Sequence, residues 1–69
     1  MKGTVVWFNE SKGIGYIKDD ESGEEISAHF TEIKRKGFRT LYEGERVSYS
    51  IEKTKFNALK AVNIELIRK

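Results

Sequence analysis

The sequence contains no cysteine and no proline. Disulfides therefore cannot stabilise this chain of 69 residues, although a domain of that size buries only about 60% of its unfolded surface and is marginally stable. His29 is the single histidine, and with no cysteine beside it a structural zinc site is not expected, because such sites need four Cys or His ligands. A chain without cysteine also suits a reducing compartment.

Long apolar runs are missing as well. No run approaches the roughly 20 residues of a membrane-spanning helix. The N-terminal segment MKGTVVWF also lacks the apolar stretch and the cleavage site of a signal peptide. We therefore expect a soluble, cytoplasmic protein with no membrane partner.

Neither sign of charge dominates. Thirteen lysines and arginines face eleven acidic residues, which leaves a net charge of +2. That excess is too small to bind polyanions by charge alone. Binding to nucleic acid would depend on where the charges lie and on contacts with the bases.

The motifs of catalysis are absent from the sequence too. It has no phosphate-binding loop, no metal-ligand spacing and no motif that pairs a serine or threonine with a base. The acidic run DDESGEE (19–25) is typical of a solvated turn. We expect no enzymatic activity, no cofactor and no bound metal.

Short runs rich in β-branched and aromatic residues are what the sequence does contain. Separated by turn signals, they predict strands at 3–8, 14–18, 25–30, 46–53 and 59–67. No repeat or linker interrupts them, so residues 1–69 are predicted to form one domain. Five short strands favour a small all-β barrel, because closure removes exposed strand edges. Thr31 is a candidate cap for one helical turn at 30–34.

Side chains alternate along a strand, so each run can be assigned an inner and an outer face. The core set of the second and third runs is Ile17, Ile26 and Ala28. Their opposite face carries Ile14, Tyr16, Ser27 and His29. In the run at 46–53, Val47, Tyr49 and Ile51 share one face. In the run at 59–67, Val62, Ile64 and Leu66 share one face.

Aromatic, glycine and lysine residues gather in the segment VVWFNESKGIGYIK (5–18). Glycine within a strand often marks a bulge or a close backbone approach, so Gly13 and Gly15 would let the rings of Trp7 and Tyr16 lie on the sheet. Each base stacked on an aromatic ring contributes about 1–3 kcal/mol, and nearby lysines such as Lys12 neutralise phosphates. The segment predicts a stacking surface for single strands, whose bases are free to splay out.

At these residues the chain resembles the bacterial cold-shock proteins. KGTVVWFNESKGIGYI (2–17) is similar to their first motif, K-G-x-V-K-W-F-N-x-x-K-G-F/Y-G-F/Y-I, and EEISAHFTEI (24–33) to their second, roughly D-V-F-V-H-F-S-x-I. Residues 37–52 and 60–64 match the rest of the family pattern. The resemblance implies a five-stranded antiparallel Greek-key barrel of the oligonucleotide-binding (OB) type. It also implies binding of single-stranded RNA and DNA with limited sequence preference, and an ATP-independent RNA-chaperone role.

Carried over by position, the resemblance implies a set of nucleic-acid contacts: Trp7, Phe8, Lys12, Tyr16, His29, Phe30 and Phe38. The chain also departs from the family pattern: Ile14 replaces a usual aromatic, Ser27 replaces Phe, and Val6 replaces Lys. Two lost rings correspond to roughly 2–6 kcal/mol, although Ile14 still offers a base an apolar contact and stays in the predicted site. Phe56 joins it as a candidate replacement ring; the alternative is that Phe56 covers the end of the barrel.

The sequence is compatible with two functions. The first is single-strand nucleic-acid binding. The second, suggested by the departures at Ile14, Ser27 and Val6, is a protein-interaction module in which the reduced ring set and Ile14 form an apolar docking patch. Salt discriminates between them, because phosphate-driven binding weakens steeply as salt rises. Stacking is blind to the 2′-hydroxyl, so RNA and DNA are not distinguished. A monomer is the default expectation, with a strand-exchanged dimer as the alternative.

Overall fold

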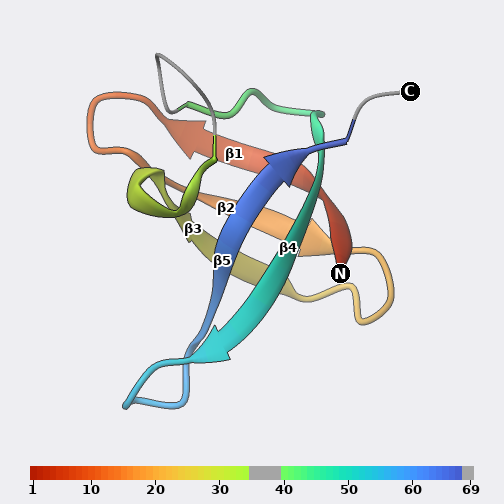
Figure 1. Ribbon diagram of the computed structural model, residues 1–69, viewed down its shortest axis with the longest axis vertical. Helices are drawn as coiled ribbons and strands as arrows, with labels where there is room; N and C mark the ends of the chain where they lie inside the picture. The colour runs from red at the N-terminus through yellow and green to blue at the C-terminus, as the bar shows by residue number, and fades with distance from the viewer. Residues whose placement is uncertain (35–39, 68–69) are drawn as a thin grey trace.

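A computed structural model describes residues 1–34 and 40–67, and these form a closed five-stranded β-barrel (Figure 1). The strands are β1 (Lys2–Asn9), β2 (Ile14–Asp19), β3 (Glu25–His29), β4 (Arg46–Lys53) and β5 (Leu59–Leu66). Their order around the barrel is β1-β2-β3-β5-β4. The predicted all-β barrel is confirmed, and each predicted strand boundary lies within one residue of the observed one.

One pairing of the barrel differs from the others. β3 and β5 run parallel and share the pair Ser27 and Lys60, whereas the other neighbouring strands are antiparallel. In Figure 1 β5 crosses in front of β2 and β3. This parallel contact closes the barrel, and alternation within single strands does not reveal it.

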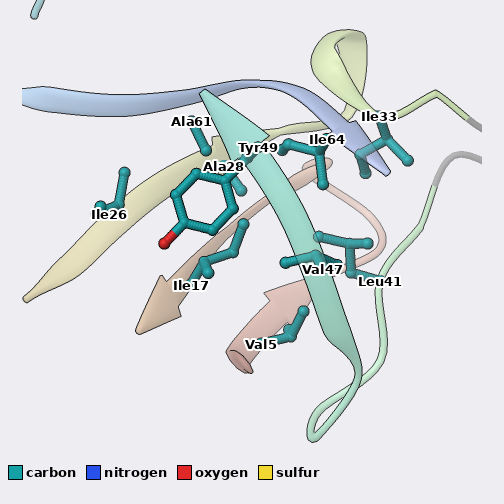
Figure 2. Close-up of a cluster of buried hydrophobic side chains, with 10 residues drawn as sticks. All are labelled: Val5, Ile17, Ile26, Ala28, Ile33, Leu41, Val47, Tyr49, Ala61 and Ile64. Atoms are coloured by element: carbon teal, nitrogen blue, oxygen red, sulfur yellow. The ribbon is translucent and has the colours of Figure 1, made fainter. Parts of the chain in front are cut away.

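The barrel interior is filled by aliphatic side chains and one tyrosine (Figure 2). The largest side chains that are fully buried are Val5, Ile17, Ile26, Leu41, Val47 and Ile64. Full burial of such a side chain contributes about 1.5–3 kcal/mol. The predicted core set of β2 and β3 is confirmed, as is the predicted inner face of β4, where Val47 and Tyr49 are buried and Ile51 packs against the cluster.

A bulge in β1 turns Trp7 outward. Between Val5 and Trp7, β1 advances two residues while β2 advances one, so Val6 is the extra residue. Strict alternation from the buried Val5 would place Trp7 in the core. The extra residue instead puts both Val6 and Trp7 on the outer face and turns Phe8 inward, where it packs against the core.

A second register shift corrects the prediction for β5. Along one stretch of the pair, β4 advances two residues while β5 advances three, and Asn63 in that stretch has φ 53°. As a result Ala61 and Ile64 both reach the core cluster, whereas Val62 is buried outside it. The predicted common face of Val62, Ile64 and Leu66 is therefore wrong for Val62, because alternation holds only in a strand without a bulge.

The single helical turn after β3 is the 3-10 helix η1 (Phe30–Glu32). Its N-cap is His29, whose Nδ1 accepts the backbone N–H of Thr31 at 3.3 Å. The prediction of Thr31 as the cap is wrong by two residues, because an imidazole nitrogen replaces the usual hydroxyl or carboxylate acceptor. Within the described ranges, no helix has the length and apolar character needed to cross a membrane.

A buried hydroxyl–carboxylate pair ties β2 to β4 at one end of the barrel. The Tyr49 hydroxyl donates to Asp19 Oδ1, and Asp19 Oδ2 accepts the backbone N–H groups of Glu21 and Ser22 at 3.2 and 3.0 Å. The hydrogen bond from Tyr49 is the main cause that lowers the pKa of Asp19. Burial is the main cause that raises the pKa of Tyr49, so the carboxylate is ionised and the phenol neutral near pH 7.

Candidate nucleic-acid interface

Trp7 and Tyr16 lie side by side on the outer face of the barrel. The β1 bulge makes them a cross-strand pair, and their rings stack with centroids 6.2 Å apart and planes inclined by 26°. Their exposed fractions are 44% and 43%. Two large rings are therefore held against each other while each keeps nearly half of its surface in water.

The same face continues toward η1 through Ile14, His29 and Phe30. Ile14 pairs with His29 across β2 and β3, and the His29 and Phe30 ring centroids are 4.7 Å apart. Ile14 and Phe30 are 40% and 39% exposed. We call the exposed side chains of this face the platform: Trp7, Ile14, Tyr16, His29 and Phe30.

Hydrogen bonds fix the orientation of His29 within the platform. Its Nδ1 accepts from the Thr31 backbone and lies 2.8 Å from the Thr31 hydroxyl. Since Nδ1 acts as an acceptor, the neutral ring carries its proton on Nε2. His29 therefore presents an N–H donor, as well as a ring face, on the exposed side.

Gly13 allows the Phe30 ring to lie close to the chain. Gly13 has φ 69°, and a Cβ there would lie 2.4 Å from Cδ1 of Phe30. The Phe30 backbone N–H also donates to the Gly13 carbonyl at 2.8 Å. The absence of a side chain at Gly13 thus allows the Phe30 ring to pack directly against the backbone.

Gly15 allows Phe8 to pack beneath the platform. A Cβ at Gly15 would lie 2.2 Å from the Trp7 carbonyl oxygen and 2.6 Å from Cδ1 of Phe8. Both glycines permit a close approach, but the rings that approach them are those of Phe30 and Phe8 and not those of Trp7 and Tyr16, and the bulge lies in the neighbouring strand.

The remaining predicted site residues occupy other places. Phe8 is half-buried against the core and supports the platform from below. Lys12 is exposed in the β1–β2 turn, where its backbone N–H donates to Asn9 Oδ1 at 3.0 Å. Phe38 lies outside the described residues. Phe8 and Lys12 therefore do not contribute exposed rings to the platform.

Phe56 projects into solvent from the β4–β5 loop. It is 83% exposed, and Lys55 Nζ lies 5.9 Å from the centroid of its ring. So large an exposed fraction contradicts the alternative that Phe56 covers the end of the barrel. Its ring is available to a ligand, and Thr54 on the same loop borders the groove described next.

A groove of about 400 Å³ adjoins the platform between β3 and the start of β5. Ile14, Tyr16 and His29 belong to both surfaces. Ser27, Thr54 and Lys60 line the groove beyond them. The sequence placed Ser27 on the outer face and identified it as the position of a missing ring, and it did not identify Thr54 or Lys60. The signal that would have found them is the parallel contact of β3 with β5.

The described residues offer little to a metal ion. Across 1–34 and 40–67, no group of three or more histidine or acidic side chains is gathered where it could hold one. The polar groups of the interface are hydroxyls, an imidazole, lysines and the single carboxylate of Glu32. Such groups bind bases and phosphates through hydrogen bonds and charge.

Comparison with known proteins relates this barrel to others. A model of the 'Cold-shock' DNA-binding domain matches residues 1–67. The Cold shock-like protein CspA of Vibrio cholerae is 49% identical over 55 residues, which cover 80% of this chain and 79% of that protein. The Cold shock-like protein CspE of Escherichia coli K12 is 47% identical over 51 residues, or 74% of each chain.

Two longer proteins also contain a similar segment. Glycine-rich protein 2 of Nicotiana sylvestris is 43% identical over 63 residues, which are 91% of this chain and 29% of that protein. The solved structure titled drosophila Unr CSD456 superposes with a TM-score of 0.80 at 22% identity, over 97% of this chain and 26% of that one. At that identity the superposition establishes the fold alone, and it confirms the OB-type barrel that the resemblance implied.

Proposed function

The chain belongs to the cold-shock domain family, and we propose that it binds single-stranded nucleic acid across the platform. Family membership makes nucleic acid its class of partner and makes the chain a binding protein rather than an enzyme. The restriction to single strands, the stacking mode and the residues that carry it are the proposal.

The exposed ring pair of Trp7 and Tyr16 is the observation that supports this most directly. A small domain has little apolar surface to bury, and here two of its largest rings stay in water. Each stacked base contributes about 1–3 kcal/mol, so two bases would contribute about 2–6 kcal/mol. Only unpaired bases offer their faces to such rings, which favours single strands over duplexes.

An RNA-chaperone role follows from this mode of binding. A protein that binds the open form of a hairpin and not the paired form stabilises the open form by mass action, by about 2.7 kcal/mol at a concentration of 100 times Kd. No ATP is consumed, because the shift comes from binding alone. Stacking reads few base edges, so many sequences would be bound.

Fluorescence of Trp7, the single tryptophan, tests the proposal directly. We expect short oligothymidine and oligouridine to quench it in a saturable way, with an affinity that falls as salt rises. Tyr16→Ala should weaken binding about 5-fold or more, which corresponds to about 1 kcal/mol or more. Tyr42→Ala, which removes an exposed tyrosine outside the platform, is the matched control. Absence of quenching at low salt would refute single-strand binding.

A protein-interaction module is the second candidate function. The exposed fractions of Val6 and Ile14, 37% and 40%, favour it because both side chains are aliphatic and lie on the outer face. Docking of an apolar patch depends little on salt, whereas phosphate contacts depend on it steeply. A partner whose affinity is unchanged between low and moderate salt would support this second function.

A further inference from the structure

The groove between β3 and β5 has the size and position of a ligand site that continues from the platform. Its volume of about 400 Å³ lies within the range of roughly 300–1,000 Å³ common for small-molecule sites. Gly15, Ala28 and Ala61 are the small residues among those that line it, and Tyr16 and His29 join it to the platform. A strand crossing the platform therefore passes the mouth of this groove.

Ser27 gives the groove a hydrogen-bond acceptor. Its hydroxyl donates to the Leu59 carbonyl oxygen at 3.1 Å. With its single hydrogen used in that bond, Ser27 Oγ has only lone pairs left to offer a ligand. Phosphate oxygens and base carbonyls are acceptors themselves, so the groups of a single strand that can donate to Ser27 are the N–H groups of the bases and, in RNA, the ribose 2′-hydroxyl.

Hydrogen-bond donors lie at the end of the groove where β5 begins. Thr54 Oγ1 accepts the backbone N–H groups of Phe56 and Ala58, each at 3.2 Å, and these bonds leave its hydroxyl hydrogen available. Lys60 Nζ lies 3.8 Å from Glu52 Oε1, a loose ion pair in which the lysine keeps 44% of its side chain exposed. Both groups suit a base carbonyl or the phosphate that follows the base.

An acidic side chain lies at the other end of the groove, so the two ends differ in charge. Glu32 also lines the groove, and its Oε1 accepts the Asn63 backbone N–H at 3.4 Å. A phosphate near Glu32 would be repelled, whereas a phosphate near Lys60 would be attracted. The charge arrangement therefore favours a nucleotide whose phosphate lies at the Lys60 end of the groove.

We propose that this groove takes one unpaired nucleobase, edge first, and that Ser27 Oγ accepts a hydrogen bond from an N–H group of that base. The inference rests on the proposed single-strand binding and adds to it a second mode of recognition. The platform stacks bases by their faces and tolerates any sequence. The groove reads the edge of one base, and it makes binding depend on which hydrogen-bonding groups that edge carries.

Methylation of the base isolates this hydrogen bond. The probe is an oligouridine, compared with the same oligomer carrying a methyl group on N3 of every uracil in place of the hydrogen. One neutral hydrogen bond is worth about 0.5–1.5 kcal/mol net, so methylation should weaken binding to the native protein about 2- to 13-fold. Ser27→Ala should remove this difference and bind both oligomers alike.

Two further variants control for structural damage. Ser27→Thr keeps the hydroxyl and should keep the sensitivity to methylation. Ser50→Ala removes an exposed serine from β4, away from the groove lining, and should behave as the native protein does. Ser27→Ala also loses the bond to Leu59, but the ratio of the two affinities is measured on one folded protein and does not depend on its stability.

The outcomes separate the groove from the platform. Quenching of Trp7 with equal affinity for both oligomers would overturn the groove proposal and leave the platform intact. Equal sensitivity to methylation in Ser27→Ala and the native protein would also overturn the groove proposal, because the acceptor of the uracil N3–H would then not be Ser27. Failure of both oligomers to quench Trp7 would overturn single-strand binding, and the groove proposal with it.

Discussion

Replacement of Gly13 by alanine would test whether the packing of Phe30 against Gly13 matters for nucleic-acid binding. Gly13 has φ 69°, a conformation that disfavours L residues by roughly 1–2 kcal/mol. The added methyl would also lie 2.4 Å from Cδ1 of Phe30, well inside contact distance. Phe30 is 39% exposed, so its ring can move outward to relieve the clash. The substitution would then remove the ring from its place beside His29 without opening the core.

Gly23→Ala is the matched control for this change. Gly23 has a similar φ of 73°, but no atom lies within 4 Å of the position of its Cβ. Both variants should lose about 1–2 kcal/mol of stability from backbone strain. Only Gly13→Ala should also lose the contribution of one stacked base, about 1–3 kcal/mol, which weakens binding about 5- to 150-fold.

The assay combines urea denaturation with titration of Trp7 fluorescence by oligothymidine. Stability changes are read from the midpoint, and affinities are measured well below it so that both variants remain folded. Equal affinity of Gly13→Ala and Gly23→Ala would refute the reasoning, because it would mean that the position of Phe30 has no influence on the bound strand.

Three other changes test separate parts of the structure. Phe56→Ala should leave the urea midpoint unchanged, because the ring is 83% exposed, and should weaken oligothymidine binding about 5-fold or more; unchanged affinity would discard Phe56 as a replacement ring. The hydrogen bond from Tyr49 is the main cause that lowers the pKa of Asp19 below its ordinary value of 3.8, so Asp19 should stabilise the barrel above about pH 4, and this stability should be lost as the pH falls through the lowered pKa; in urea titrations at pH 7 and pH 3, Tyr49→Phe should shrink that loss. Gly15→Ala should destabilise the barrel by about 1–3 kcal/mol or more in thermal denaturation, since its methyl would lie 2.2 Å from the Trp7 carbonyl oxygen; an unchanged midpoint would contradict the close approach.

Most of the barrel could be predicted from the sequence because β2 and β3 are regular. The β2–β3 pair has no register shift, so the two-residue period holds along both strands and places Ile17, Ile26 and Ala28 on the buried face. Their opposite face then follows from the two-residue period of a strand. Ile14 and Tyr16 could be placed outside for that reason alone, and the structure confirms it.

The bulges mark the limit of that approach. One extra residue reverses the face of every side chain that follows it. The sequence of β5 contains no signal for the register shift near Asn63. In β1 the same effect would have assigned Trp7 to the core, had alternation been the only guide. The glycines of the partner strand and the family resemblance gave the outer position, whereas the physical cause is the extra residue Val6.

The groove could not be predicted because it depends on a contact between distant segments. Ser27 and Lys60 become neighbours only where β3 meets β5 in parallel. Each residue taken singly resembles an ordinary solvated side chain. The acceptor role of Ser27 follows only from the structure, in which its hydroxyl donates to the Leu59 carbonyl oxygen.

Stacking on base faces and hydrogen bonding to a base edge contribute unequally to the binding free energy. The difference predicts both the affinity and its dependence on base identity. Tyr16 and Ser27 are direct cross-strand partners, so Tyr16 has the Trp7 ring on one side and the groove on the other. A further ring at position 27 would add about 1–3 kcal/mol for any base, whereas the hydrogen bond proposed for Ser27 adds about 0.5–1.5 kcal/mol for a base with a suitable N–H. Exchanging the first for the second lowers affinity overall but raises its dependence on base identity. We therefore expect this barrel to bind single strands more weakly than a barrel with a ring at that position, and to discriminate more sharply between an oligouridine and its N3-methylated form.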